Sequence, residues 1–188
     1  TKKLEEKKYL NEAISHADDL LATFSSLLKI ARAEASLKNN FKLINLTEVV
    51  NSVIELYLPL AEEEKISLNF KILENQNSWG DPHLVAQAIA NLIDNSIKYT
   101  SEYGEINIIL DSATDGVYFS ISDTGPGIPK NLHEKVLERL YRVDNSRSSS
   151  GSGLGLSLVN AVVKSHNLDL KLENLEPGLQ VTIFFPKD

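Results

Sequence analysis

Cysteine and methionine are both absent from this chain of 188 residues. Without cysteine, disulfides and thiolate metal sites are excluded, which fits a reducing compartment. There is no apolar run long enough to span a bilayer and no signal peptide. The net charge of −7 comes without a basic stripe, which argues against a nucleic-acid surface. Because the chain opens at Thr1 and lacks methionine throughout, we expect a fragment or a processed chain, with one compact domain and an appendage.

Residues 91–99, Asn-Leu-Ile-Asp-Asn-Ser-Ile-Lys-Tyr, carry the first pattern with chemical meaning. On a helix, Asn91 and Asn95 lie one turn apart on one face, and Lys98 falls near it. Two neutral amides suit Mg²⁺ that phosphate oxygens already neutralise, because Mg²⁺ takes few protein ligands. Lys98 supplies positive charge for phosphate. By itself the segment also fits an ordinary amphipathic helix whose polar residues face water.

The second pattern, residues 123–128, follows an alternating run typical of a strand. Asp123 can accept a hydrogen bond from an exocyclic amine. Gly125 and Gly127 remove Cβ atoms where the backbone turns sharply and a ligand approaches. Taken alone, the segment equally fits a common strand-ending turn.

The third pattern is a glycine cluster at residues 151–155, which opens a helix predicted to end near Ser165. Such a segment presents backbone N–H groups and the positive end of the helix dipole to a phosphate. The spacing excludes a P-loop, since no lysine directly follows the glycines. A dinucleotide fingerprint is excluded as well, because the preceding strand and the following acidic residue are missing.

In this order, the three patterns resemble the N, G1 and G2 boxes of the Bergerat ATP-binding fold. Within that superfamily, their sequences are most similar to those of the sensor histidine kinases of two-component systems. The resemblance implies that ATP binds with Mg²⁺ held by Asn95 and Asn91, and that Asp123 selects adenine. Bergerat ATPases of the topoisomerase, mismatch-repair and chaperone types are disfavoured by the short chain and the heptad stalk described below. The residues implied to bind nucleotide are Asn91, Asn95, Lys98, Tyr99, Asp123, Gly125, Gly127, Ile128, Arg142, Gly151, Gly153, Leu154, Gly155, Leu156 and Thr182.

Residues 138–150 are rich in arginine and serine and predict a loop, similar to the family's F box and ATP lid. Arginines can hold phosphate through paired N–H groups, and Arg142 stands at the position implied to contact phosphate. The other interpretation of these arginines is a solvated loop face. Leu137 and Leu140 replace the usual phenylalanines, so we expect the lid's packing, and its communication with the helical stalk, to differ from the family's.

Residues 1–40 predict one long helix, because neither proline nor glycine interrupts Lys2 to Asn40. A heptad seam resembles the second helix of the dimerisation and histidine-phosphotransfer domain, which implies a homodimer through this stalk. The other interpretation is a lone amphipathic helix that folds back on the globular part. The seam consists of Leu10, Ile14, Ala17, Leu21, Phe24, Leu28, Ala31 and Ala35.

The family's phospho-accepting histidine lies on the first stalk helix with an acidic neighbour, and none of this chain's four histidines fits that context. Only His133 precedes an acidic residue, and it lies in the globular part. We therefore predict an ATP site without its phospho-acceptor, no catalytic residue in this chain and no autophosphorylation by it alone. The implied partners are ATP or ADP, a second copy and a response-regulator receiver domain. The resemblance also implies the cytoplasmic portion of a protein that is anchored in the bacterial inner membrane through regions upstream.

The remaining periodicity predicts an α+β fold, a two-layer α/β sandwich over residues 41–188 that follows the coiled-coil-type helix of residues 1–40. Thr47 is the expected N-cap of a helix that runs to about Glu64, with a kink or break at Pro59. Asp81 is expected to cap the helix of the asparagines, with Pro82 in its first position. Strands are predicted at residues 41–46, 66–70, 78–81, 105–110, 117–122, 168–173 and 180–185.

The predicted function is the catalytic domain of a histidine kinase, which presents the γ-phosphate of Mg-ATP to a stalk histidine. Catalysis would rest on positioning and charge neutralisation more than on covalent chemistry. The alternative is a nucleotide-gated regulatory module, or pseudokinase, without phosphotransfer output.

Overall fold

A computed structural model describes residues 2–35, 40–143 and 153–187 of the chain. In none of the helices within these ranges is there a stretch long and apolar enough to cross a membrane. The elements in chain order are α1 (Lys2–Ala35), β1 (Lys42–Asn45), α2 (Leu46–Glu63), β2 (Ser67–Ile72), β3 (Asn77–Gly80), α3 (Pro82–Tyr99), β4 (Glu105–Ala113), β5 (Gly116–Asp123), the 3₁₀ turns η2 (Lys130–Leu132) and η3 (Lys135–Leu137), α4 (Gly155–Ser165), β6 (Asp169–Leu175) and β7 (Gly178–Pro186).

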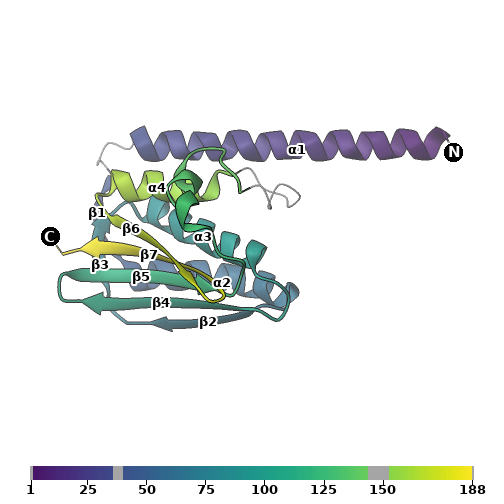
Figure 1. The fold of residues 1–188 in the computed structure, drawn as a ribbon. Coiled ribbons are helices and arrows are strands. Elements are labelled where there is room, and N and C mark those ends of the chain that lie inside the picture. Colours follow the sequence, from purple (N-terminus) through teal and green to yellow (C-terminus); the bar gives the residue numbers. More distant parts are fainter. Residues whose placement is uncertain (1, 36–39, 144–152, 188) are drawn as a thin grey trace.

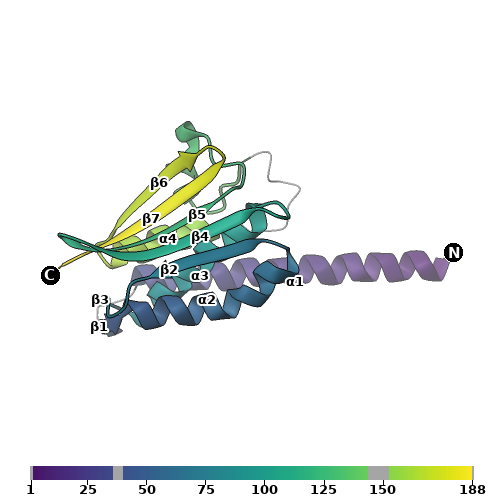
Figure 2. The ribbon, with the colours of Figure 1, turned by 90° about the horizontal axis from the view of Figure 1, so that it is seen from below.

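A five-stranded sheet in the order β2-β4-β5-β7-β6 forms one layer of the domain (Figure 1). The β2–β4 pair is parallel and the other three pairs are antiparallel. Because side chains alternate between the two faces of a strand, one face is apolar, and helices α2, α3 and α4 cover it (Figure 2). The predicted two-layer α+β sandwich is thereby confirmed. The largest buried side chains of this layer are Ile106, Ile108, Leu110, Phe119 and Ile121.

Strands β1 and β3 form a separate antiparallel pair that is not part of the five-stranded sheet. Leu43 and Trp79 lie directly opposite each other in this pair, and both are exposed. On the other face of the pair, Ile44 is buried in the core. The small sheet therefore closes one end of the helical layer and leaves the five-stranded sheet unextended.

The ends of α2 and α3 are set by side chains that accept backbone N–H bonds. Asn45, not Thr47, caps α2 by accepting from Glu48 N at 3.3 Å. The Thr47 hydroxyl instead donates to Leu73 O at 2.8 Å, and α2 continues through Pro59 without a break. Asp81 caps α3 as predicted, by accepting from the backbone N of residues 83 and 84.

The imidazole of His166, at the end of α4, joins the two helices that carry the asparagine and glycine patterns. Its Nε2 accepts from Asp81 N at 3.0 Å, and its Nδ1 lies 2.9 Å from Val162 O. The ring also stacks on Phe41, with centroids 4.4 Å apart. An imidazole that accepts through Nε2 and donates through Nδ1 is the neutral form. This histidine is structural, and it fixes the N-terminus of α3 against the C-terminus of α4.

Helix α1 extends well beyond the globular part, and its C-terminal turns lie against α4 (Figure 1). Ile30 and Ala33 are buried there, and Glu34 pairs with Arg139 after η3. The described large apolar side chains of the heptad seam stay exposed, because the docked residues occupy a different face of the helix. The seam positions with exposed large side chains are Leu10, Ile14, Leu21, Phe24 and Leu28.

Candidate functional site

The carboxylate of Asp123, at the end of β5, is held by three hydrogen-bond donors from three parts of the chain. Its Oδ1 accepts from Gly125 N at 2.9 Å and from Leu179 N at 3.4 Å. Its Oδ2 accepts from the Ser96 hydroxyl at 3.4 Å. Burial raises the pKa of the Asp123 carboxyl, and these three hydrogen bonds oppose the rise. The group is thus fixed in orientation and poised as an acceptor.

Asn91 and Asn95 project from α3 toward the first residue of α4. A Cβ added at Gly155 would lie 3.1 Å from both Oδ1 and Nδ2 of Asn95, and 3.5 Å from Oδ1 of Asn91. The Asn91 amide nitrogen donates to Gln87 O at 2.7 Å, which leaves its Oδ1 on the side of Gly155. The fold therefore brings the asparagine pattern and the glycine cluster, some sixty residues apart in sequence, to one place.

Helix α4 begins at Gly155, and among the described residues no side chain caps this start with a hydrogen bond. Leu154 precedes it as a fully buried residue whose carbonyl accepts from Leu158 N at 2.9 Å. Leu156 follows in the first turn and packs against the core. An uncapped helix start presents backbone N–H groups to an anion. Because Gly155 has no Cβ, the Asn95 and Asn91 side chains can lie directly against the start of α4.

The loop after β5 is anchored on both sides. A Cβ at Gly125 would lie 2.8 Å from Tyr99 O, so this glycine permits close contact with the end of α3. Gly127 has a φ of +68°, which favours glycine. Ile128 exchanges two backbone bonds with the Asn174 side chain, N to Oδ1 at 3.1 Å and Nδ2 to O at 2.6 Å. The loop is therefore locked between α3 and the β6–β7 hairpin.

Three further candidate residues lie at the ends of segments near the site: Lys98 and Tyr99 at the end of α3, and Arg142 just before residues 144–152. The Lys98 ammonium lies 5.1 Å from the centroid of the Tyr99 ring, a cation–π contact at the end of α3. A Cβ at Gly153, whose φ is +68°, would lie 2.8 Å from Cγ of Arg142. The two flanks of residues 144–152 therefore meet at Gly153 and Arg142. Gly151 and most of the predicted lid lie outside the described residues.

Thr182 is not brought to the site. It pairs with Ser120 in the register of β5 and β7, and the neighbouring Ile121 and Val181 point into the core. Thr182 therefore lies on the opposite face of the sheet from Ile121 and from Asp123, two residues further along. There it accepts from the Gln180 side chain at 3.4 Å. Adenine recognition through Thr182 is incompatible with this placement.

Sequence reasoning missed four residues that shape the site: Ser96, Asn174, Gly178 and Leu179. Gly178 has a φ of +117°, and a Cβ there would lie 1.7 Å from Asp123 O, so only glycine lets β7 approach the end of β5. A signal for Ser96 existed, because it directly follows Asn95 on a helix already marked as functional. Asn174, Gly178 and Leu179 gave no local signal, since their role depends on strand pairing.

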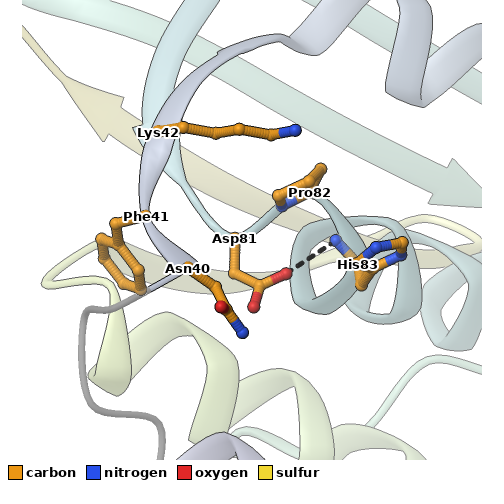
Figure 3. A pocket seen from close by; sticks show the side chains of 6 residues that line it. All are labelled: Asn40, Phe41, Lys42, Asp81, Pro82 and His83. Carbon is orange, nitrogen blue, oxygen red and sulfur yellow. Dashed lines mark hydrogen bonds between the residues drawn. The ribbon is translucent and has the colours of Figure 1, made fainter.

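A pocket of about 420 Å³ at the opposite end of α3 is a separate feature (Figure 3). In Figure 3 the Asp81 carboxylate accepts from His83 N. None of the candidate site residues lines this pocket. Its lining consists of Asn40, Phe41, Lys42, Asp81, Pro82 and His83.

The amino-acid sequence matches a known protein family. The histidine kinase-, DNA gyrase B- and HSP90-like ATPase family matches residues 80–188. Hybrid signal transduction histidine kinase D of Dictyostelium discoideum is 35% identical over 96% of this chain and 12% of its own length. Adaptive-response sensory kinase SasA of a Synechocystis strain is 33% identical over 73% of this chain and 37% of its own length. The chain thus spans well under half of these two relatives.

Solved structures agree with the fold. The catalytic domain of histidine kinase ThkA, in a nucleotide-free form, superposes with a TM-score of 0.70 at 28% identity, over 78% of this chain and 97% of that one. The structure of ThkA in complex with the response regulator protein TrrA gives a TM-score of 0.77 at 24% identity, over 97% of this chain and 51% of that one. The second likeness extends the shared fold to nearly the whole chain.

Proposed function

Because the chain belongs to the histidine kinase-, DNA gyrase B- and HSP90-like ATPases, as the ATP-binding domain of a histidine kinase, we propose that it presents Mg-ATP to a phospho-accepting histidine elsewhere in its protein. One observation carries the proposal. The Asn95 and Asn91 side chains lie against Gly155 at the start of α4, and Ser96, the residue after Asn95, donates to the Asp123 carboxylate.

The residues fit a nucleotide in three separate ways. Asp123 supplies an acceptor for the exocyclic amine of adenine, and guanine, with a carbonyl oxygen in that position, would place acceptor against acceptor. The backbone N–H groups at residues 155–157 and the Arg142 guanidinium supply donors for phosphate. Lys98 adds a positive charge at the end of α3.

Mg²⁺ fits the Asn95 and Asn91 side chains, because their amide oxygens are hard neutral ligands and the missing Cβ of Gly155 lets both side chains lie together at the start of α4. When bound, it would neutralise phosphate charge. Within the described part of the chain there is no cluster of three carboxylate or imidazole ligands, so an all-protein metal cage is not offered there. The asparagines can hold a metal only together with ligand oxygens from the nucleotide and water.

The partners proposed for the whole protein follow from the same family. ThkA was solved with the response regulator TrrA, so a receiver domain that accepts the phosphoryl group on aspartate is the proposed partner here. The exposed seam on α1 supports pairing with a second copy of the chain. A cytoplasmic position in a membrane-anchored bacterial sensor is a proposal that rests on the resemblance alone.

Two measurements test this function. Calorimetry with Mg-ADP, Mg-ATP and Mg-GTP should show binding of both adenine nucleotides and clearly weaker binding of GTP. A chain extended upstream to include a phospho-acceptor helix should form acid-labile, base-stable phosphate from ATP, whereas the present chain should not. Equal affinity for GTP and ATP would contradict the role of Asp123. Binding without labelling of the extended chain would favour the pseudokinase alternative.

A further inference from the structure

The two oxygens of the Asp123 carboxylate are not equivalent. An ionised carboxylate offers about two acceptor directions on each oxygen. Both backbone donors, Gly125 N at 2.9 Å and Leu179 N at 3.4 Å, go to Oδ1. The Ser96 hydroxyl goes to Oδ2 at 3.4 Å. Only Oδ2 therefore retains an acceptor direction that a ligand can use.

Ser96 is placed to control that remaining direction. It follows Asn95 on α3 but turns to the buried side of the helix, where only 5% of its surface is exposed. Its hydroxyl reaches across to the end of β5, 27 residues further along the chain. A buried hydroxyl has no water to bond, so a bond to the carboxylate meets its requirement for a partner.

We propose that Ser96 is a positioning residue for adenine recognition: its hydroxyl fills one side of Asp123 Oδ2 and leaves the other side as the single acceptor for the base amine. This proposal rests on the nucleotide-binding function proposed above. The hydroxyl also favours the ionised carboxylate, which accepts and cannot donate. An ionised Asp123 rejects the guanine carbonyl, whereas a protonated one could donate to it. Ser96 thus supports both the affinity for adenine and the discrimination against guanine.

The surroundings of Asp123 make this effect measurable by pH. Burial raises the pKa of its carboxyl, and the Ser96 bond is one of the three hydrogen bonds that lower it. None of the titratable groups on the packed elements is a cause of the shift. They are His83, Asp94, Lys98 and Tyr99 on α3, Glu105 and Asp111 on β4, and Asp169, Lys171 and Glu173 on β6. Affinity for adenine should fall as the pH falls through the pKa of Asp123. Removal of the hydroxyl should move that fall to higher pH.

The test compares Ser96→Ala with the parent chain by calorimetry with Mg-ADP, from pH 5 to pH 8. We expect Ser96→Ala to bind about three- to tenfold more weakly at the acidic end, the worth of one hydrogen bond. The midpoint of its affinity loss should lie at a higher pH than that of the parent. Protonation of the nucleotide's phosphates is common to both proteins and cancels in the ratio of their affinities. Ser120→Ala is the matched control, since Ser120 is equally buried on the opposite face of the sheet and should bind like the parent.

A second variant, Ser96→Cys, keeps the test decisive if Ser96→Ala does not fold. Ser96→Cys keeps a weak donor of similar size, so its midpoint should fall between those of the parent and Ser96→Ala. The proposal is overturned if Ser96→Ala keeps the parent's affinity at every pH, or loses affinity by the same factor at every pH. It is also overturned if neither variant folds, because the serine is then only structural. Failure of the proposed function is distinct from these results, because the parent itself would then not bind Mg-ADP.

Discussion

Replacement of Asp123 by asparagine separates what this side chain does for ligand binding from what it does for the fold. An asparagine can keep its oxygen at the position of Oδ1, where Gly125 N and Leu179 N both donate. Its amide nitrogen then takes the position of Oδ2 and can donate to the Ser96 hydroxyl. In that orientation the nitrogen faces the adenine amine, donor against donor. The flipped orientation is worse for the protein, because it sets the nitrogen against two backbone donors.

The expected loss of affinity follows from this geometry. A hydrogen bond to a charged group contributes about 1.5–3 kcal/mol. At roughly 1.4 kcal/mol for each tenfold change in affinity, Asp123→Asn should bind Mg-ADP about 10- to 100-fold more weakly. Because the new amide donates, the preference for ATP over GTP should also narrow. Calorimetry with the three nucleotides measures both effects.

The stability of the same variant should change in the opposite direction. Burial raises the pKa of Asp123, so its contribution to folding is fully present below the pKa of the unfolded chain and is lost as the pH rises through the folded value. Asparagine carries no charge at any pH, so the variant does not lose this contribution. The free energy of unfolding of the variant should therefore rise relative to that of the parent as the pH rises toward neutrality, and thermal unfolding between pH 4 and pH 8 measures the difference.

An exposed acidic residue, Asp169, provides the matched control, since Asp169→Asn removes the same charge from β6 away from the site. That control should bind Mg-ADP and Mg-ATP with the parent's affinity. Parent-like binding of Mg-ADP by a folded Asp123→Asn variant would refute the assignment of Asp123. A variant much less stable than the parent at neutral pH would show that the carboxylate's hydrogen bonds outweigh its desolvation.

Three further substitutions probe the metal, the hairpin and the helix junction. Asn95→Ala should stay folded but lose most of the affinity that Mg²⁺ adds to ATP binding; calorimetry with and without Mg²⁺ checks this, and an unchanged gain would show the helix face to be misassigned. Gly178→Ala should lower the free energy of unfolding by roughly 2–5 kcal/mol, because the new Cβ meets Asp123 O and the backbone is left-handed; denaturant titration measures this, and parent-like stability would contradict it. His166→Phe should cost about 1–3 kcal/mol in the same assay, since Asp81 N loses its buried acceptor; a neutral effect would mean that water replaces the imidazole.

The parts of the site that could be predicted are those set by local periodicity. A spacing of four placed Asn91 and Asn95 on one helix face, and both face the start of α4. The order Asp-Pro marked the beginning of α3 correctly, because an accepting side chain followed by a residue without N–H suits a first helical turn. Local chemistry determined these features, so no knowledge of the tertiary fold was needed.

The parts that could not be predicted depend on which strands meet. Gly178 and Leu179 contact Asp123 only because β7 pairs with β5. A glycine in a turn does not by itself predict which strand that turn will contact. The assignment of Thr182 failed for a different reason. The alternation of apolar residues along β7, with Val181 and Ile183 buried, already implied that Thr182 faces the other way. The prediction of Thr47 as the cap was wrong because the helix begins two residues earlier, and Asn45 at the end of β1 accepts the N–H of Glu48.

The contact between α1 and α4 has an energetic scale that sets how firmly the helix is attached. Burial of an isoleucine such as Ile30 stabilises by about 1.5–3 kcal/mol, and Ala33 adds less. The pair of Glu34 and Arg139 is about half exposed, a setting in which ion pairs contribute about 0–1 kcal/mol. Binding of a ligand at micromolar affinity releases about 8 kcal/mol, which exceeds that sum. The free energy of this contact is therefore small on the scale of one such binding event.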